Sequence, residues 1–542
     1  METPSKYESP HVRSTQDSYS QSFSHWKSVF ERFTLTLDMF LAESINLDSV
    51  LKQRDAQTWG HLEASLTYID EVYKSLETRC SQVQKAREVL GTIRNRSRSL
   101  APLNILPVET VYRILRYAGA DCINDREDPQ SLKGCTPSPL QNLLITSKYL
   151  REVSTGRPSL WTHIDLVLDN KLSRPYMRHA KSCLRYSAQL PLQIHIAENV
   201  DLNEKSPVED VVKLLARCIR QIISLDLRVS ISLAPSIILG LYRDKPAIHC
   251  QLNELFIVDR ESDSRWLSPD FYESFFGYSW NRFSLPNLVM LGIYAPYIPL
   301  SSPVYRGLTA LKLAPHYTKH TPLRPTLPEL VGVLNACPDL RSLSLIGCEF
   351  QKLNRSDKIK PMRLSKLEIL DVRKTFKEDL IQLLSCISTS SSELALSISF
   401  NPEMSETETN ALSLFIVQTN VTRLMLDATR YYGSGSVTWL LQELPTVREL
   451  AVSQYNLNRP PRELFSRLSC LQTLHLIWCP YTPEGLRPAL ECSSVQSLGI
   501  NHEQWQFHKL VGSVPRLEWR EYPITTHRGV EFEWPVALPF FG

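Results

Sequence analysis

The sequence predicts an α/β protein in which an N-terminal helical segment and a short helical module precede a long solenoid of strand–helix units. Three observations predict this fold. Apolar residues recur in steps of three and four over the N-terminal part of the chain. A Leu-Pro pair opens a short apolar helix near residue 106. A short apolar phrase then recurs at a nearly constant spacing in the C-terminal half.

The composition limits the classes of protein to which the chain can belong. The chain has 542 residues, 43% of them hydrophobic, which is enough to bury a large core and excludes a disordered chain. Its 60 basic and 57 acidic residues are too evenly balanced to draw the whole molecule onto nucleic acid or a membrane. Neither a signal-peptide core nor an apolar run of about 18 residues is found. We therefore expect a soluble protein of the cytoplasm, the nucleus or both.

The cysteines and the N-terminus give further limits. Twelve cysteines without a C-x-x-C pair suit buried thiols in a reducing compartment better than disulfides or a zinc site. Residues 1–24 are expected to form a disordered tail. Residues 25–99 are expected to be helical and similar to a coiled coil. In the first helix of this region, the residues at helical spacing are Trp26, Val29, Phe30, Phe33, Leu37 and Phe40.

A second apolar series, from Trp59 to Leu90, forms about four heptads of a seam that is broken only at Arg87. Two accounts of this seam are open. It can pair with a second copy of the chain, or it can fold back on the first helix. Because Tyr, Cys and Arg at seam positions are poor specifiers of a dimer, an intramolecular pairing or a weak self-association through 59–90 is favoured.

The next region, 100–168, contains a helical module. It begins with "LNILPVETVYRILRYA" at Leu103, in which proline stands at the helix start, where its missing amide hydrogen costs nothing. Residues 119–139 are rich in Gly, Pro, Asp and Ser and predict a loop. A second helix follows from Leu140, and the module closes with "RPSLWTHIDL". The first helix carries more apolar residues than one buried surface needs.

The C-terminal half contains repeats of the form L-x-x-L-x-L. Successive copies follow one another at a nearly constant interval, which is doubled once, and "LALSIS" at Leu394 divides that double interval in half. Looser copies begin at Leu288 and Gly307, and "ISLDLRV" and "LNELFIV" are the earliest candidates. The full copies begin at Leu340, Leu367, Val421, Val447, Leu471 and Val495.

The repeat predicts its own architecture. The three apolar positions of each phrase point inward from a short strand, and the residues between strands have helical apolar spacing. One unit cannot bury its apolar face alone. Stacked units form a curved leucine-rich-repeat solenoid with a concave parallel sheet and convex helices. We expect this solenoid over 169–527, with 528–542 as its C-terminal cap.

With the repeats in place, the module resembles the F-box, which begins with Leu-Pro-x-Glu, continues through an apolar helix and closes with Leu-Trp. The layout resembles a large group of leucine-rich-repeat F-box proteins of mushroom-forming fungi. The resemblance implies a three-helix module that docks onto a Skp-type adaptor and, through it, a cullin-RING ubiquitin ligase. A helical cap on the solenoid is the alternative reading of 103–168. The implied adaptor-binding residues are Leu106, Pro107, Glu109, Val111, Ile114, Leu115, Leu144 and Trp161.

No sequence motif predicts catalysis. P-loop, H-E-x-x-H and G-x-S-x-G patterns are absent, and His475 and His502 lack a third ligand type nearby. We therefore expect no enzyme, no catalytic residues, no metal and no cofactor. An interaction scaffold without a ubiquitin ligase role, and an enzyme with an unrecognised site, are the competing classes.

Specificity in a receptor of this kind should lie on the concave sheet. The mixture of charges and apolar side chains there is typical of a face that binds an unknown target protein. It lacks the basic and aromatic pattern expected for nucleic acid. The predicted target-binding residues are Asp371, Arg373, Arg423, Met425, Asp427, Glu449, His475 and Asn501.

Overall fold

The computed structural model divides the chain into two compact units, Met1–Asn95 and Arg96–Gly542, which we describe separately. The described residues are 10–52, 63–96, 105–118, 140, 148–169, 173–198, 208–230, 233–242, 250–259, 285–294, 298–314, 324–351, 361–375, 377–391, 393–399, 406–427, 446–453, 470–477, 479, 495–501 and 518–522.

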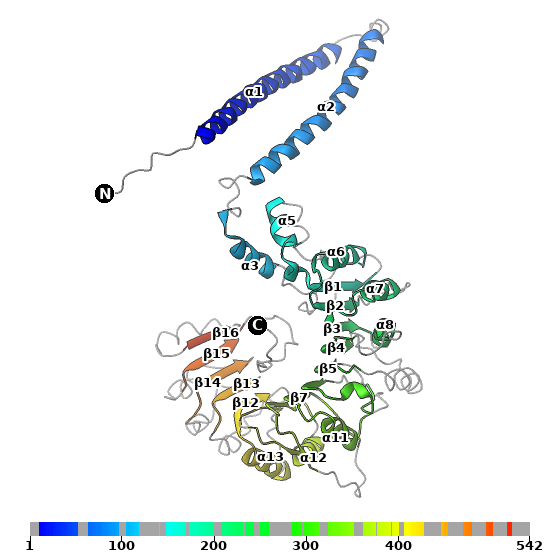
Figure 1. Cartoon of the computed structure of the whole chain (residues 1–542), viewed down its shortest axis with the longest axis vertical. Coiled ribbons are helices and arrows are strands. Elements are labelled where there is room, and N and C mark those ends of the chain that lie inside the picture. Colours follow the sequence, from blue (N-terminus) through cyan, green and yellow to red (C-terminus); the bar gives the residue numbers. More distant parts are fainter. Residues whose placement is uncertain are drawn as a thin grey trace, which may run out of the picture. The chain divides into compact units, whose positions relative to one another are not determined.

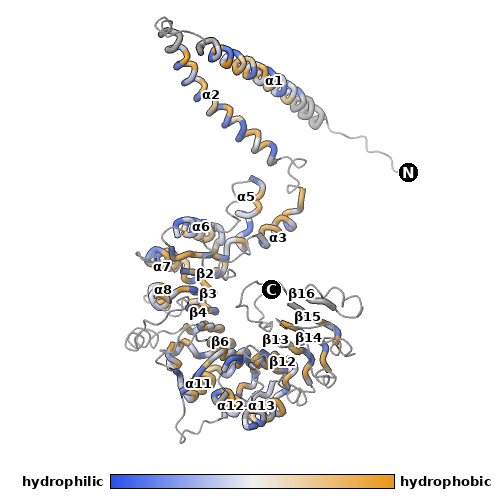
Figure 2. Tube along the Cα trace, turned by 180° about the vertical axis from the view of Figure 1, so that it is seen from behind, coloured by the Kyte–Doolittle hydropathy of each residue, from blue (hydrophilic) through white to orange (hydrophobic). Residues whose placement is uncertain are grey.

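The first unit contains two long helices, α1 (Pro10–Lys52) and α2 (Glu63–Arg96). The predicted helical region is thus present. The predicted disordered tail differs from the structure, because residues 10–24 are helical. Pro10 is compatible with this helix start, because in the first turn a proline removes no helical hydrogen bond. In Figure 2, hydrophobic and hydrophilic residues alternate along both helices, as expected for helices with an apolar side.

The apolar residues of these helices remain exposed. On α1, Trp26, Phe30 and Phe33 are 42 to 51% exposed. On α2, the seam residues Ile69 and Tyr73 are exposed too. The intramolecular account of the seam requires these side chains to be buried within one chain. Their exposure leaves them available to a second copy.

The second unit begins with a helical module made of α3 (Val108–Ala118), α5 (Lys148–Thr155) and the short 3-10 helix η5 (Pro158–Trp161). These helices contact one another in sequence order. Trp161 is fully buried, and its indole N–H donates to the carbonyl oxygen of Ser154 over 2.8 Å. The predicted loop over 119–139 lies outside the described residues.

A 14-stranded sheet follows, and its strands lie side by side in sequence order with every pair parallel (Figure 1). The helices between strands lie on the outer side of the sheet (Figure 1). They are α6 (Ser173–Tyr186), α7 (Val208–Leu215), α8 (Leu233–Tyr242), α11 (Leu327–Asn335), α12 (Lys377–Cys386) and α13 (Glu406–Gln418), with the 3-10 turn η9 (Pro303–Tyr305). The strands are β1 (His163–Leu168), β2 (Leu192–Glu198), β3 (Ile222–Val229), β4 (Glu254–Asp259), β5 (Met290–Tyr294), β6 (Ala310–Leu313), β7 (Ser342–Leu345), β9 (Ile369–Asp371), β11 (Leu394–Ser399), β12 (Val421–Asp427), β13 (Glu449–Ser453), β14 (Thr473–Ile477), β15 (Ser497–Asn501) and β16 (Glu518–Tyr522). Two short strands, β8 (Met362–Arg363) and β10 (Ile387–Ser388), pair separately.

The strand register confirms the predicted leucine-rich-repeat solenoid. The second apolar position of every predicted phrase pairs with its equivalent in the next strand, so that one ladder of side chains runs into the core. These residues are Leu343, Leu370, Leu396, Leu424, Leu450, Leu474 and Leu498, and each is at most 1% exposed. Stacking of units buries a continuous core, as the repeat requires.

The sheet begins earlier than expected. β1 lies inside the region 100–168 that was assigned to the helical module, and the phrase search missed β1, β2 and β16. In these three strands Ile164, Ile194 and Trp519 hold the ladder position that leucine holds in the predicted copies. A search for a leucine phrase at one interval does not find such units. The predicted cap at 528–542 lies outside the described residues.

The nine cysteines within the described residues are all free, and seven are buried. Buried thiols were the expectation from the sequence. None of the helices in the described part of the chain is long and apolar enough to span a membrane.

Candidate functional site

Three of the predicted adaptor-binding residues form the core of the helical module. Val111, Leu115 and Trp161 are at most 1% exposed, so they support a binding surface and do not form it. The prediction is corrected in this respect, because a fully buried side chain cannot contact a partner. Leu106 is partly buried against the core. The remaining predicted residues Pro107, Glu109 and Ile114 are exposed, and Leu144 lies outside the described residues.

An apolar strip lies on the exposed side of α3. Thr110, Ile114 and Tyr117 follow one another at i, i+4 and i+7 and therefore share a side of the helix. Ile114 is 43% and Tyr117 81% exposed, and Ile105, which precedes the helix, is also exposed. We call Ile105, Thr110, Ile114 and Tyr117 the α3 strip. Sequence reasoning missed Ile105 and Tyr117, although the spacing of Tyr117 from Ile114 was a usable signal.

Polar contacts hold α3 against the rest of the module. The Tyr149 hydroxyl donates to the carbonyl oxygen of Leu106 over 3.3 Å. The hydroxyls of Tyr112 and Ser159 are 3.1 Å apart, and the Arg157 guanidinium lies 5.8 Å from the Tyr112 ring centroid. The α3 strip is therefore presented by a helix whose start and middle are both anchored.

The predicted target-binding residues lie on the side of the sheet opposite to the leucine ladder. Asp371 is in register with Ser397, then with Met425, Ala451 and His475. This register row lies on the side of the sheet where the repeat predicts the binding face. Binding of a target there remains a prediction.

Most of these residues are buried, however. Asp371, Arg373, Met425, Asp427 and His475 are all at most 7% exposed. Only Arg423 and Glu449 are partly exposed among the members whose exposure the structure describes. A small apolar cluster on this face contributes to the burial, and its members are Ile369, Ala395, Met425, Ala451 and Ile477. Direct target contact by the five buried side chains is therefore not supported.

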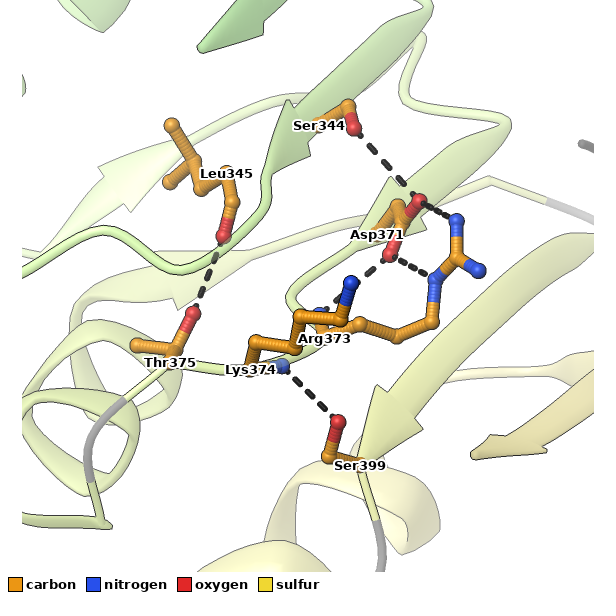
Figure 3. A network of polar contacts seen from close by, with 7 residues as sticks. All are labelled: Ser344, Leu345, Asp371, Arg373, Lys374, Thr375 and Ser399. Carbon is orange, nitrogen blue, oxygen red and sulfur yellow. Dashed lines mark hydrogen bonds and ion pairs between the residues drawn. The ribbon is translucent and has the colours of Figure 1, made fainter. Parts of the chain in front are cut away.

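Asp371 and Arg373 form a bidentate ion pair (Figure 3). Arg373 donates from Nε to Asp371 Oδ1 over 2.9 Å and from Nη2 to Oδ2 over 2.7 Å. The Ser344 hydroxyl lies 3.5 Å from Oδ2. Beside the pair, the amide of Lys374, whose φ is +59°, donates to the Ser399 hydroxyl over 2.8 Å. These contacts satisfy the carboxylate internally, which indicates a structural role.

His475 has a comparable arrangement on β14. Its Nε2 lies 2.7 Å from Glu449 Oε1 on the neighbouring strand. The histidine is buried, whereas the glutamate is partly exposed. His475 therefore holds the orientation of Glu449, and His502, the second histidine considered from the sequence, lies outside the described residues.

The more accessible part of the concave face lies on β3 to β6. Arg228, Phe256, Tyr294 and Lys312 are partly exposed there. The Lys312 ammonium lies 4.8 Å from the Tyr294 ring centroid, a cation–π contact. Aromatic side chains and arginine are enriched in protein interfaces. We call these four residues the β3–β6 surface. These strands were among the looser copies of the phrase, but the predicted target-binding residues all lie on β9 or beyond it.

A cluster of titratable residues lies on the first three strands. His163 and Asp165 come from β1, His195 from β2 and Asp226 from β3. Asp165, His195 and Asp226 share one register row, which was the signal available to a repeat search extended upstream. Burial is the main cause that lowers the pKa of His195 to about 4, and His163 lowers it further. The His195 imidazole is therefore neutral near pH 7.

Comparison with protein families and with curated proteins finds no match. Among solved structures, the chain is 14% identical to TLR13 in the crystal structure of the TLR13–ssRNA13 complex, over 57% of this chain and 51% of that chain, with a TM-score of 0.26. The chain thus spans about half the length of that protein. It is also 14% identical to a leucine-rich-repeat protein of Leptospira interrogans, over 67% of this chain and 91% of that chain, with a TM-score of 0.23. The fold assignment rests on the strand order and register of this chain, and what the chain presents is a leucine-rich-repeat solenoid joined to a helical module.

Proposed function

We propose that this chain is the substrate-recognition subunit of a Skp-cullin-F-box type ubiquitin ligase. In this proposal, the helical module binds a Skp-type adaptor, the adaptor links it to a cullin-RING ligase, and the concave sheet binds a target protein. The chain contributes proximity and no catalytic group, because holding a target lysine near the charged enzyme raises its effective concentration.

The observation that carries the proposal is the α3 strip. A Leu-Pro pair starts the helix, the buried Val111 and Leu115 anchor it, and Ile114 and Tyr117 remain exposed. Exposed apolar side chains grouped on an anchored helix are typical of a docking surface. The resemblance to the F-box supplies the partner, which is a Skp-type adaptor.

The same unit also supports delivery of a target. The module and the sheet belong to one compact unit, and η5 leads directly into β1. An adaptor bound at α3 and a target bound to the sheet are then held by one folded body. For the target we assign the β3–β6 surface together with the partly exposed Arg423 and Glu449.

The test is binding of a purified Skp-type adaptor to the full chain, measured by calorimetry. We expect wild type to bind and an Ile114→Glu, Tyr117→Glu variant to lose at least about 2 kcal/mol of binding free energy, as for the centre of an interface. Both side chains are exposed, so the variant should fold. Arg116→Glu adds an acid to another side of the same helix and should bind as wild type does. Absence of adaptor binding by the folded wild type, or equal binding by all three proteins, would exclude the proposal.

An interaction scaffold is the second candidate function, and the exposed seam of α2 favours it. Exposed Ile69 and Tyr73 and partly exposed Leu76 stand at heptad positions. We propose that a second copy of the chain covers them. In light scattering after size exclusion, the full chain should have the mass of a dimer at high concentration.

The matched variants for this prediction lie on one helix. Ile69→Glu with Leu76→Glu places charges in the seam and should give a monomer, and glutamate retains helix propensity. Thr78→Glu places the charge outside the seam and should leave the mass unchanged. A monomeric wild type at every concentration, or a dimer that survives the seam variant, contradicts self-association through α2.

A further inference from the structure

We propose that His163, Asp165 and His195 form a binding site for a divalent transition-metal ion on the concave side of β1 and β2. The site is independent of adaptor and target binding. The three residues each offer one ligand atom, and these atoms all lie within 4.8 Å of one another. The structure brings them together from two neighbouring strands.

The distances fit a metal centre after a small adjustment. Metal–nitrogen and metal–oxygen bonds of about 2.1 Å place neighbouring ligand atoms about 3 to 3.5 Å apart. His163 Nε2 and Asp165 Oδ1 already lie 3.1 Å apart. The two imidazole rings lie 4.4 Å apart between centroids, with an interplanar angle of 38°. Closure of the site around an ion requires a small rotation of the His195 ring, which is partly exposed.

The arrangement is more than a hydrogen-bonded His–Asp pair. The His195 imidazole lies beside this pair, with its ring centroid 4.4 Å from that of His163. Two imidazoles and one carboxylate, whose ligand atoms lie within 4.8 Å of one another, are ligand types that bind zinc and other borderline first-row metals. Calcium and magnesium prefer oxygen ligands and are disfavoured.

Asp226 provides support from the third strand. Its Oδ2 lies 3.8 Å from His195 Nδ1, and its own partner Arg228 lies 3.9 Å away on the same strand. Metal-binding histidines commonly donate their second ring N–H to a carboxylate. We assign Nε2 of His195 to the metal, with Nδ1 on the side of Asp226. Asp226 is therefore assigned as a positioning residue.

The position of the site suggests what the ion does. β1 is the edge strand of the 14-stranded sheet. Two ligands from β1 and one from β2 would join this edge strand to its neighbour across the sheet. An ion that binds the folded chain and not the unfolded chain raises the melting temperature. The ion would thus stabilise the junction between the helical module and the repeats.

The experiment uses the full chain after removal of bound metal with a chelator. Titration with Co²⁺ is followed by visible absorption, and titration with Zn²⁺ by calorimetry. We expect one strong equivalent of either ion and a higher melting temperature with Zn²⁺. His163→Gln, His195→Gln and Asp165→Asn should abolish the strong equivalent. Asp226→Asn should weaken the affinity for the ion by about tenfold or more, as expected for a carboxylate that contacts a metal-binding histidine.

His475→Gln is the matched control. His475 is also a histidine paired with a carboxylate on this sheet, but the described residues offer it no place in a three-ligand cluster. The His475→Gln variant should still bind one equivalent of Co²⁺ tightly. A second measurement needs no variant. In wild type, Zn²⁺ should protect His163 and His195 against chemical modification, as mapped by mass spectrometry. Absence of strong binding by wild type, or binding and protection independent of these residues, overturns the proposal.

Discussion

Arg373→Met is expected to destabilise the solenoid by about 3 to 5 kcal/mol, the cost of leaving a buried charge without its partner. The Arg373 and Asp371 side chains are 4% and 10% exposed, and the pair is bidentate. Without the guanidinium, the Asp371 carboxylate keeps two uncharged donors, the Ser344 hydroxyl and the backbone amide of residue 373.

The free energy of unfolding from urea titration checks this expectation. Arg341 and Glu368 form an exposed pair at 3.2 Å on neighbouring repeats, and Arg341→Met should cost less than about 1 kcal/mol. Combining Arg373→Met with Asp371→Leu should recover much of the loss, because apolar side chains often replace buried ion pairs well. A cost for Arg373→Met no larger than that for Arg341→Met would contradict a structural role of the pair.

Trp161→Ala is expected to cost about 3 to 5 kcal/mol, the range for deleting a large buried aromatic side chain. Trp161 is fully buried at the point where η5 leads into β1. Its ring centroid lies 5.1 Å from that of Tyr186 and 6.4 Å from that of His179, both on α6. The same side chain donates to Ser154 on α5. The substitution therefore weakens the module and the first repeat together, and adaptor binding should fall with stability.

Two further variants separate the contributions. Trp161→Phe keeps most of the ring and removes the hydrogen bond to Ser154, so it should cost about 1 to 2 kcal/mol. Trp26→Ala on α1 removes an indole that is 42% exposed and should change the free energy of unfolding by no more than about 0.5 kcal/mol. Thermal and urea unfolding of the three variants give the comparison. An effect of Trp161→Ala equal to that of Trp26→Ala would show that Trp161 does not join the two parts.

The helical module was only partly predictable. The Leu-Pro pair placed the start of α3 correctly, since proline is tolerated in the first turn of a helix and breaks its interior. The same pattern suggested that Val111, Leu115 and Trp161 contact a partner, whereas the structure buries them. Sequence periodicity shows that residues are apolar. It does not show which of them a neighbouring helix covers.

The concave face was also only partly predictable. Period-two alternation placed Asp371, Met425 and His475 opposite to the core, and the register agrees. Their burial was not predictable, because it depends on side chains from the neighbouring strands on either side. The accessible β3–β6 surface was missed because the predicted target-binding residues all come from later repeats. The cluster at His163 was missed because Ile164 and Ile194 stand where the phrase has its second leucine.

The spacing of apolar residues along the chain was enough to predict the solenoid of parallel strands, the helical module ahead of it and the two apolar helices at the N-terminus. It was enough because each repeat carries an apolar face that only stacked neighbours can bury. Which side chains are accessible and which converge became known only from the folded chain. His163 and Asp165 meet His195, which belongs to the next strand, only because parallel strands bring equivalent positions into register. Which side chains lie together and which are exposed depends on their neighbours in the folded chain. The order of residues in the sequence does not determine this by inspection.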